Sequence, residues 1–567
     1  MNERALRWLR RGVGVAVDLA ALYAVGVIRW WAQWRGAPSI STAGVDDIPI
    51  GWWRYGSLTD LLLIGPDAGN WASNTRAWLD GAPLDVHRLP VYSYLTGWMT
   101  RIFDDIAFAG HMVNHLASAL TAGVVYFLGR ALGGRGVGLG AALLVALAPT
   151  LINTKIHYGV DPTLHLALYA FFATSIAAAR GPWWMVIPAG LLGGVCAATH
   201  YLGLLFPIPV ALLVAVGRRR WWARLAAPAA LLALSYASWR VLMHPYPQVG
   251  LGTISAVYAE GVAGSTSAAR VSGTTLDAAV AFVTQRLGGA TALALARGLS
   301  TLGTLPWALL VVGFWLGFFG PGLGRLGEAP SPEAPRWRRA WGHLRQVWDP
   351  QGTLWLVVLM GPLVLMEAAR APDRYTLYGL PLLFIALARG VASACAGLDA
   401  LLRRAWGRWP GGALAVVAAL GLALAVQDEM RARWPGIPPV EEGVQDREIG
   451  LAIAEAMPVG EGEQAIATTS QNLPFYTGRR RCPARPCPTE GDVVRLCAKQ
   501  LQEQCLGRGD IPYVVEARLA HGFADRPNEA MDQAIQERFP LIAETEGEER
   551  SLRVYRVTRS GLAELGR

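Results

Sequence analysis

Charged residues are scarce in this chain. They make up 16% of its 567 residues, whereas an ordinary soluble protein carries roughly a quarter. Hydrophobic residues reach 53%, and the mean hydropathy is +0.30. These values exclude a purely soluble protein. At about 20 apolar residues per crossing, the length admits roughly ten or more helical spans and leaves room for a folded domain.

Lysine is almost absent, because Lys155 and Lys499 are the only two in the chain. Arginine carries nearly all the positive charge, which is typical of a GC-rich genome and favours a bacterial source. The net charge of +9 is unevenly distributed, since residues 1–427 hold 33 basic and 19 acidic side chains and residues 428–567 hold 18 and 23. A nucleic-acid-binding protein needs a basic soluble surface, and the soluble part here is acidic. No nucleic-acid partner is therefore predicted.

Apolar runs of membrane-spanning length recur through residues 1–427, and a hydropathy window predicts about 11 transmembrane helices. The runs lie near residues 12–28, 107–129, 137–153, 162–179, 183–199, 201–216, 225–243, 302–320, 353–368, 377–395 and 413–426. We therefore expect a polytopic α-helical membrane module over residues 1–427 and a soluble domain over residues 428–567.

Arginines in alternate short connections indicate the orientation of these helices. They are Arg4, Arg7, Arg10, Arg11, Arg130, Arg135, Arg180, Arg218, Arg219, Arg220, Arg224, Arg336, Arg338, Arg339, Arg345, Arg403, Arg404 and Arg408. By the positive-inside rule this side is the cytoplasm, so the N-terminus is cytoplasmic and the soluble domain extracytoplasmic, as in a bacterial inner membrane protein. Two outer loops are then long, about residues 29–106 and about 244–300.

The first apolar run is predicted to be retained in the membrane. A cleaved signal peptide is the alternative, but no small-residue cleavage site follows the run. Arg29, Trp30 and Trp31 come directly after it and are typical of an interfacial anchor. Asp18 is the one acidic residue within the run, and a carboxylate at that depth requires a buried partner or a nearby cavity.

The first outer loop holds the most informative motif. Asp67 is placed to begin a short helix as its N-cap, with a helix-like stretch over residues 72–79 and a turn over 80–83. A segment with the pattern basic-x-Pro-x-Tyr follows, containing Arg88 and Tyr92. Residues 141–149 with 158–161, and residues 370–375 with Pro381, add two further motifs in the same order.

This set of motifs resembles the GT-C superfamily of membrane glycosyltransferases. The similarity is to the branch of the protein O-mannosyltransferases and lipid A aminoarabinose transferases, a family 39-like group, and it covers about a third of the chain. One departure is that many relatives carry a second acid directly after the first, where this chain has Ala68. This departure argues against a role for paired carboxylates at the start of the loop.

The resemblance implies a GT-C fold and a function. The protein would be an inverting glycosyltransferase that moves a sugar from a polyprenyl-phosphate donor to an acceptor hydroxyl at the extracytoplasmic membrane face. Its partners would be the polyprenyl-phosphate-linked sugar, a lipid, glycan or protein acceptor, and membrane lipids. The alternative is a multispan transporter or lipid flippase, which needs ionisable residues near the membrane midplane and an internal repeat. A scaffold that displays the soluble domain is a third interpretation.

Such a transfer needs a base and a site for a phosphate. Asp67 is the candidate catalytic base, because a carboxylate in a partly dehydrated pocket has a raised pKa. Arg370 and Arg374 can hold the leaving phosphate, although arginines at a helix end also snorkel to the head groups. By resemblance Asp161 positions the sugar or the acceptor, and before Pro162 it also suits a helix cap. The other predicted substrate-binding residues are His87, Arg88, Tyr92 and His157.

Histidines concentrate at the outer side, which predicts a polar outer cavity. Seven of the nine fall in outer loops or within about two helical turns of them. These are His87, His111, His115, His157, His165, His200 and His244. His111 and His115 are four residues apart and share one helix face, as a metal pair would need. No HExxH motif occurs, and interfacial histidines are commonly satisfied by water or head groups, so a metal is the less favoured interpretation. No cofactor is predicted, and a divalent metal stays open.

Residues 428–567 have the pattern of a small α/β domain. Helix-like stretches at residues 447–456, 490–504 and 528–537 alternate with strand-like stretches at 464–468, 513–516, 541–543 and 552–557. The segment 473–479 resembles one found in the soluble tails of related bacterial transferases, and a strand and turn without a ligand is the alternative.

Four of the six cysteines lie in the soluble domain and are disulfide candidates in an oxidising compartment: Cys482, Cys487, Cys497 and Cys505. In a helix, Cys497 and Cys505 would be about 12 Å apart, beyond the roughly 7 Å limit for a bridge. Both then pair with the Cys482–Cys487 segment or stay free, and a zinc site is the competing interpretation. Cys196 and Cys395 are expected in the core.

Overall fold

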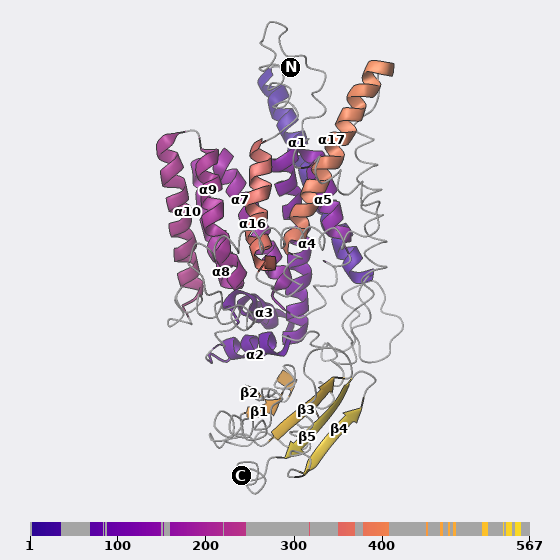
Figure 1. Cartoon of the computed structure of the whole chain (residues 1–567), viewed down its shortest axis with the longest axis vertical. Helices are drawn as coiled ribbons and strands as arrows, with labels where there is room; N and C mark the ends of the chain where they lie inside the picture. The colour runs from indigo at the N-terminus through magenta and orange to yellow at the C-terminus, as the bar shows by residue number, and fades with distance from the viewer. Residues whose placement is uncertain are drawn as a thin grey trace, which may run out of the picture.

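The computed structural model describes residues 3–35, 68–82, 84, 88–148, 151, 159–218, 220–244, 317, 350–368, 378–406, 450–451, 465–468, 475–476, 480–483, 513–519, 537, 540–546 and 550–556. Within these residues, helices form a bundle, two further helices cross one end of it, and a β-sheet lies beyond that end (Figure 1). The N-terminal end of the first helix lies at the opposite end of the bundle from the sheet (Figure 1). The orientation of the bundle in the membrane stays a prediction.

The bundle contains nine α-helices in the described part of the chain. They are α1 (Glu3–Arg35), α4 (Ile106–Gly133), α5 (Arg135–Leu147), α7 (Asp161–Arg180), α8 (Val186–Thr199), α9 (Pro207–Gly217), α10 (Trp221–Leu242), α16 (Pro350–Ala368) and α17 (Leu380–Trp406). Each coincides with a predicted span. The spans predicted at residues 302–320 and 413–426 fall almost wholly outside the described residues, so the total of 11 stays a prediction.

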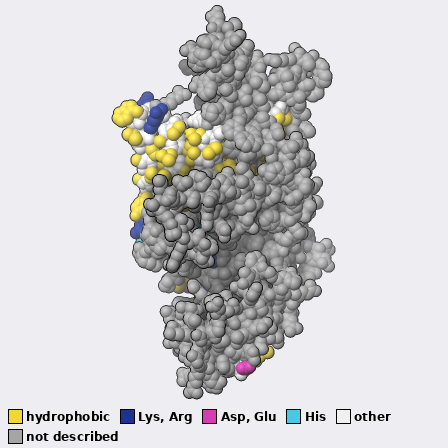
Figure 2. Space-filling view, in the orientation of Figure 1, with side chains coloured by type: hydrophobic (Ala, Val, Ile, Leu, Met, Phe, Trp, Pro, Cys, Tyr) yellow, Lys and Arg dark blue, Asp and Glu magenta, His cyan; other side chains and the backbone are white. Residues whose placement is uncertain are grey.

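By length and composition, α4, α7 and α10 are able to cross a membrane, and the described residues also include shorter apolar helices. α7 is buried on nearly all sides, and Leu168, Phe171 and Phe172 are fully buried. α10 forms one edge of the bundle, where hydrophobic side chains cover the surface (Figures 1 and 2). A helix that is apolar all round and exposed on one face matches a lipid-facing position.

Small residues set the distance between α8 and α10. A Cβ atom added at Gly194 would lie 2.5 Å from the Cβ atom of Ser238 and 2.6 Å from the carbonyl oxygen of Ser235. Side chains other than hydrogen therefore do not fit there. Close backbone approach at small residues is the usual way in which membrane helices gain van der Waals contact.

Arginines at the end of the bundle away from the sheet hold helix ends together. Arg180 Nη1 donates to the carbonyl oxygen of Ala131 at 2.7 Å, and Arg218 Nη1 donates to that of Gly181 at 3.0 Å. Both acceptors lie at helix C-termini, where the helix dipole favours positive charge. The arginines that predicted the cytoplasmic side therefore also cap helices.

Asp18 has one buried partner, Tyr126, and two arginine partners that are partly exposed. Its carboxylate accepts from the Tyr126 hydroxyl at 2.7 Å and from Arg135 Nε at 3.0 Å, and it forms a further ion pair with Arg130. Arg135 also donates to the Gly14 carbonyl oxygen at 3.0 Å. The carboxylate thus joins α1 to the short connection between α4 and α5.

We predict that Asp18→Asn lowers the thermal unfolding temperature, because the amide loses two ion pairs that are partly open to solvent. Thermal unfolding of the purified protein in detergent measures the change. Asp104→Asn, at the turn between α3 and α4, is the matched control and is expected to have a smaller effect. A stability equal to that of the wild type would contradict the structural role of Asp18.

Two helices, α2 (Ala68–Leu79) and α3 (Pro90–Phe103), cross the sheet end of the bundle (Figure 1). The turn after α2 contains Gly81 with φ of +67°, a left-handed conformation that favours glycine. α3 begins at Pro90, where proline fits the first turn of a helix. The motif of the first outer loop therefore folds as a helical hairpin over the bundle.

A five-stranded sheet forms in the C-terminal part, in the order β2-β1-β3-β5-β4. The strands are β1 (Ala465–Thr468), β2 (Arg480–Pro483), β3 (Tyr513–Leu519), β4 (Leu541–Glu546) and β5 (Arg550–Arg556). β1 runs parallel to β2 and β3, while β3, β5 and β4 pair antiparallel. Four strands were predicted, whereas β2 is too short and basic to stand out. The predicted helices lie almost wholly outside the described residues, so the complete α/β domain stays a prediction.

Candidate functional site

A buried polar stripe runs along α4 inside the apolar bundle. It consists of His111, Asn114, His115, Ser118 and Thr121, and all five side chains are buried. Their spacing of three and four residues places them on one face of the helix. Buried polar groups within a membrane span mark a functional cavity by default. The histidine pair indicated the start of this stripe from sequence, and the same spacing could have revealed Ser118 and Thr121.

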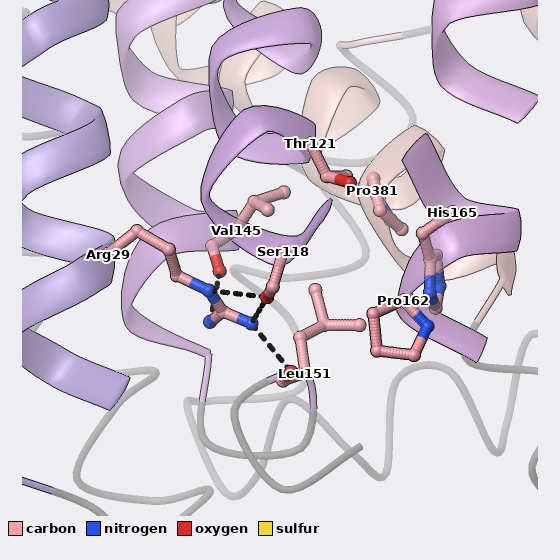
Figure 3. A pocket seen from close by; sticks show the side chains of 8 residues that line it. All are labelled: Arg29, Ser118, Thr121, Val145, Leu151, Pro162, His165 and Pro381. Carbon is pink, nitrogen blue, oxygen red and sulfur yellow. Dashed lines mark hydrogen bonds between the residues drawn. The ribbon is translucent and has the colours of Figure 1, made fainter. Parts of the chain in front are cut away.

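Arg29 of α1 reaches the polar stripe from the opposite side. Its Nε and Nη2 atoms donate to the Ser118 hydroxyl at 3.0 and 2.6 Å. Nη1 donates to the carbonyl oxygens of Val145 and Ala146 at 3.0 and 3.2 Å, and Nη2 donates to that of Leu151 at 2.6 Å (Figure 3). Five bonds thus engage all five N–H donors of the guanidinium group.

The predicted role of Arg29 as an interfacial anchor is wrong, because the side chain is only 1% exposed. Its acceptors are neutral, and Val145 and Ala146 lie in the last turn of α5. The negative end of the α5 dipole therefore compensates the buried charge. Sequence reasoning missed this role because it depends on which face of α1 turns inward.

A small pocket lies between Arg29 and α7 and has room for about one water molecule. It brings together α1, α4, α5, α7 and the start of α17 (Figure 3). The residues that line it are Arg29, Ser118, Thr121, Val145, Leu151, Pro162, His165 and Pro381. The pocket is lined by polar and apolar side chains together, and the predicted polar outer cavity stays a prediction.

Asp161, a predicted substrate-binding residue, lies at the first position of α7, beside this pocket. Its carboxylate accepts a hydrogen bond from the hydroxyl of Tyr378, which lies 217 residues later in the sequence. The Tyr378 ring lies 4.8 Å from the imidazole of His165, and the Tyr378 carbonyl oxygen accepts from the Tyr169 hydroxyl at 2.7 Å. Tyr378 therefore fixes the orientation of the Asp161 carboxylate.

The prediction that Asp161 caps α7 is wrong, because Asp161 is the first residue of the helix and the N-cap is the residue before it. Val160 is the N-cap of α7, and no side chain caps this helix end. The carboxylate is instead used in the bond with Tyr378. His165 Nδ1 lies 3.1 Å from the Asp161 carbonyl oxygen, and because a carbonyl only accepts, this nitrogen carries the proton. The other ring nitrogen of neutral His165 is then an acceptor.

Arg88 and Tyr92 lie together at the hairpin of α2 and α3. The Arg88 guanidinium lies 5.6 Å from the centre of the Trp71 ring. The backbone carbonyl oxygen of Arg88 accepts a hydrogen bond from Asn74 Nδ2 at 3.1 Å. The Tyr92 ring meets Trp71 edge to face at 5.4 Å, and its hydroxyl donates to the Gly110 carbonyl oxygen at 3.4 Å. Tyr92 is fully buried in the apolar cluster, so its predicted contact with substrate stays a prediction.

Two further polar groups tie this hairpin to the bundle. The Tyr94 hydroxyl donates to the Leu242 carbonyl oxygen at 3.2 Å, and burial raises the pKa of this hydroxyl to about 12. Asp105 caps α4 by accepting from the backbone nitrogen of Phe108 at 2.6 Å, and burial raises the pKa of its carboxyl. Both groups hold helix ends that frame the site.

Several predicted site residues fall outside the described part of the chain: Asp67, His87, His157, Arg370, Arg374, Cys487, Cys497 and Cys505. α2 begins at Ala68, directly after Asp67, as the predicted helix start requires. Cys482 lies in β2, and its pairing stays a prediction. Cys196 and Cys395 are buried and free, as expected.

The divalent metal that the sequence left open stays a prediction. Among them, no group of three or more His, Cys, Asp or Glu residues could hold a metal ion. His115 Nδ1 lies 2.8 Å from the His111 carbonyl oxygen, so this nitrogen is used in a backbone contact within α4. The polar stripe therefore suits hydrogen bonding to a polar ligand.

Comparison with known proteins gives the fold its name. Residues 86–242 match the family model of the dolichyl-phosphate-mannose-protein mannosyltransferases. The structure resembles ArnT from Cupriavidus metallidurans in the apo state, with 13% identity, a TM-score of 0.51, and coverage of 98% of this chain and 99% of ArnT. The chain has the GT-C fold.

A second similar structure is the Archaeoglobus fulgidus oligosaccharyltransferase tethered to an acceptor peptide with an NVT sequon. It has 14% identity and a TM-score of 0.55, and the match covers 88% of this chain and 69% of that protein. No curated protein sequence matches the chain. The resemblance to GT-C glycosyltransferases that the loop motifs predicted is confirmed, and the protein is an integral membrane protein.

Proposed function

We propose that the protein is an inverting glycosyltransferase that uses a polyprenyl-phosphate sugar and an acceptor hydroxyl at the extracytoplasmic membrane face. The carrying observation is the buried polar site in which Asp161, Tyr378 and His165 meet at the sheet end of an apolar bundle. The matched family model spans Arg88, the α4 histidines and Asp161, and its description includes a dolichyl-phosphate sugar. A lipid-linked phosphate donor is the substrate class that this combination supports.

In the proposed reaction, the acceptor oxygen attacks the anomeric carbon while the bond from that carbon to the phosphate oxygen breaks. One displacement inverts the configuration at carbon. Asp67 takes the proton of the acceptor hydroxyl, and the polyprenyl phosphate leaves with the bonding electron pair. Arg370 and Arg374 stabilise the negative charge that develops on the leaving phosphate. Asp161, held by Tyr378, accepts hydrogen bonds from a substrate hydroxyl.

We also propose a bacterial inner membrane location with a cytoplasmic N-terminus and an extracytoplasmic sheet domain. The N-terminal end of α1 and the sheet lie at opposite ends of the bundle (Figure 1). Arg180 and Arg218 lie at the end away from the sheet, which fits the positive-inside rule. The site then faces the outer leaflet, where a lipid-linked sugar is available.

A transporter or lipid flippase is not favoured, because the family model and the similar structures are glycosyltransferases. The deciding experiment incubates the purified protein in nanodiscs with a panel of radiolabelled undecaprenyl-phosphate sugars and a membrane extract as acceptor. We expect labelled acceptor and release of undecaprenyl phosphate. Mass spectrometry of copurifying lipid is expected to detect a polyprenyl phosphate. Label moved across a proteoliposome membrane without any new glycosidic bond would refute the proposal.

We predict that Tyr378→Phe lowers kcat about tenfold, because a hydrogen bond to a charged group contributes roughly 1.5–3 kcal/mol. Phenylalanine keeps the ring beside His165 and the carbonyl acceptor for Tyr169, so the fold should persist. Initial rates with the labelled donor measure the effect. Tyr236→Phe on α10, with a half-exposed side chain, is the control and should transfer at the wild-type rate. Equal rates for Tyr378→Phe and the wild type would exclude the positioning role.

A further inference from the structure

The C-terminal part contacts the first outer loop through one pair of aromatic residues. Arg76 of α2 donates from Nη1 to the carbonyl oxygen of Phe475 at 3.0 Å. The same guanidinium lies 4.5 Å from the centre of the Phe475 ring. A hydrogen bond and a cation–π contact therefore join two residues 399 positions apart in the sequence.

Packing reinforces this polar contact. Phe475 and Tyr476 lie against an apolar cluster at the sheet end of the bundle, whose buried members are Ala68, Trp71, Ala72, Tyr92, Ala107, Phe108, Met112, Val113 and Val160. Gly450, also in the C-terminal part, lies so close that an added Cβ atom would be 2.4 Å from the Tyr476 Cβ atom. Tyr476 thus lies between the apolar cluster and Gly450, and Phe475 lies against the same cluster.

The cluster under these rings carries the elements of the proposed site. Trp71 lies on α2, which begins directly after Asp67, and its ring supports the Arg88 guanidinium. Val160 is the residue before Asp161 and is the N-cap of α7. Motion of α2 would therefore displace the adjacent Asp67 and the Trp71 ring that supports Arg88.

We infer that Phe475 and Tyr476 form a clamp on α2 that positions Asp67 and Arg88 for transfer. This inference rests on the proposed function and deepens it, since it makes the C-terminal part a working component of the active site. A display domain joined by a linker would need no such contact. Phe475, Tyr476 and Arg76 are positioning residues, because they act through α2.

The test uses hydrogen exchange of the full-length protein in nanodiscs, read on peptides that cover residues 68–79. We expect Phe475→Ala to speed exchange there about 5- to 10-fold, the size expected for loss of a cation–π contact and its packing. In the transfer assay kcat should fall by a similar factor, while KM for the donor stays within about twofold, because α2 positions the base. Phe475→Tyr keeps the ring and should restore both readouts.

A double-variant cycle separates the clamp from general loosening. Arg76→Ala removes both contacts, so adding Phe475→Ala to it should change exchange little further. Arg101→Ala is the matched control, because it removes cation–π contacts within the same hairpin, to Trp78 and Trp98, instead of the contact to Phe475. Unchanged exchange in Phe475→Ala, an equal effect of Arg101→Ala, or strictly additive effects would overturn the clamp. Coupled exchange without any detectable transfer would leave the clamp standing and refute the proposed function.

Discussion

Replacing Asp67 with asparagine is expected to slow sugar transfer about 10²- to 10⁴-fold, the usual contribution of a general base. The amide has nearly the same shape as the carboxylate but cannot accept the proton of the attacking hydroxyl. α2 should keep its position, because Asn is as good an N-cap as Asp. Single-turnover transfer from a labelled undecaprenyl-phosphate sugar measures the change.

Asp80→Asn is the control for this variant. Asp80 lies in the same loop, at the turn after α2, and its side chain is exposed. The variant should transfer at the wild-type rate. If Asp67→Asn folds, as judged by size-exclusion elution and thermal unfolding, and still transfers at the wild-type rate, Asp67 is not the base. Uptake into proteoliposomes that persists in Asp67→Asn would instead support transport.

Replacing Arg29 with methionine is expected to lower the free energy of unfolding by about 3 kcal/mol, because five hydrogen bonds of roughly 0.6 kcal/mol each are lost in a membrane setting. Methionine matches the length of the stem but leaves three backbone carbonyls and the Ser118 hydroxyl without their donor. α5 and Leu151 would then lose their hydrogen bonds to α1. Thermal or denaturant unfolding in detergent reports the loss.

Arg29→Lys should give an intermediate loss, because an ammonium has three donors and lacks the planar fork that reaches acceptors on two sides. Val27→Ala is the control on the same helix, since Val27 is 47% exposed, and its effect should be small. Wild-type stability in Arg29→Met would show that the guanidinium does not join α1, α4 and α5. It would also return Arg29 to the role of an interfacial anchor.

Apolar run length and arginine placement predicted most of the bundle. The nine described helices of the bundle fall on predicted spans because about 20 apolar residues have to leave water wherever they occur in the chain. Strand-like stretches between helix-like ones likewise predicted β1, β3, β4 and β5. β2 was missed because four residues, including two arginines, carry too little periodic signal.

The site was only partly predictable. Histidine spacing on α4 indicated a polar face, and the acid before Pro162 indicated a helix start at the outer side. The partner of Asp161, however, is Tyr378, and that of Arg76 is Phe475, each separated by hundreds of residues. No local pattern encodes such pairs, because they depend on how helices rotate and pack.

The sequence by itself determined that this is a membrane protein, which of its segments are helical spans, which end carries the polar groups and which family it resembles. Those properties follow from hydropathy, charge asymmetry and local motifs, which act over a few residues. Only the tertiary structure decided that Arg29 faces inward, that Arg130 and Arg135 neutralise Asp18, and that the C-terminal part holds α2. Each of these depends on long-range packing, in which a charged side chain bonds to whichever partner the neighbouring helix presents.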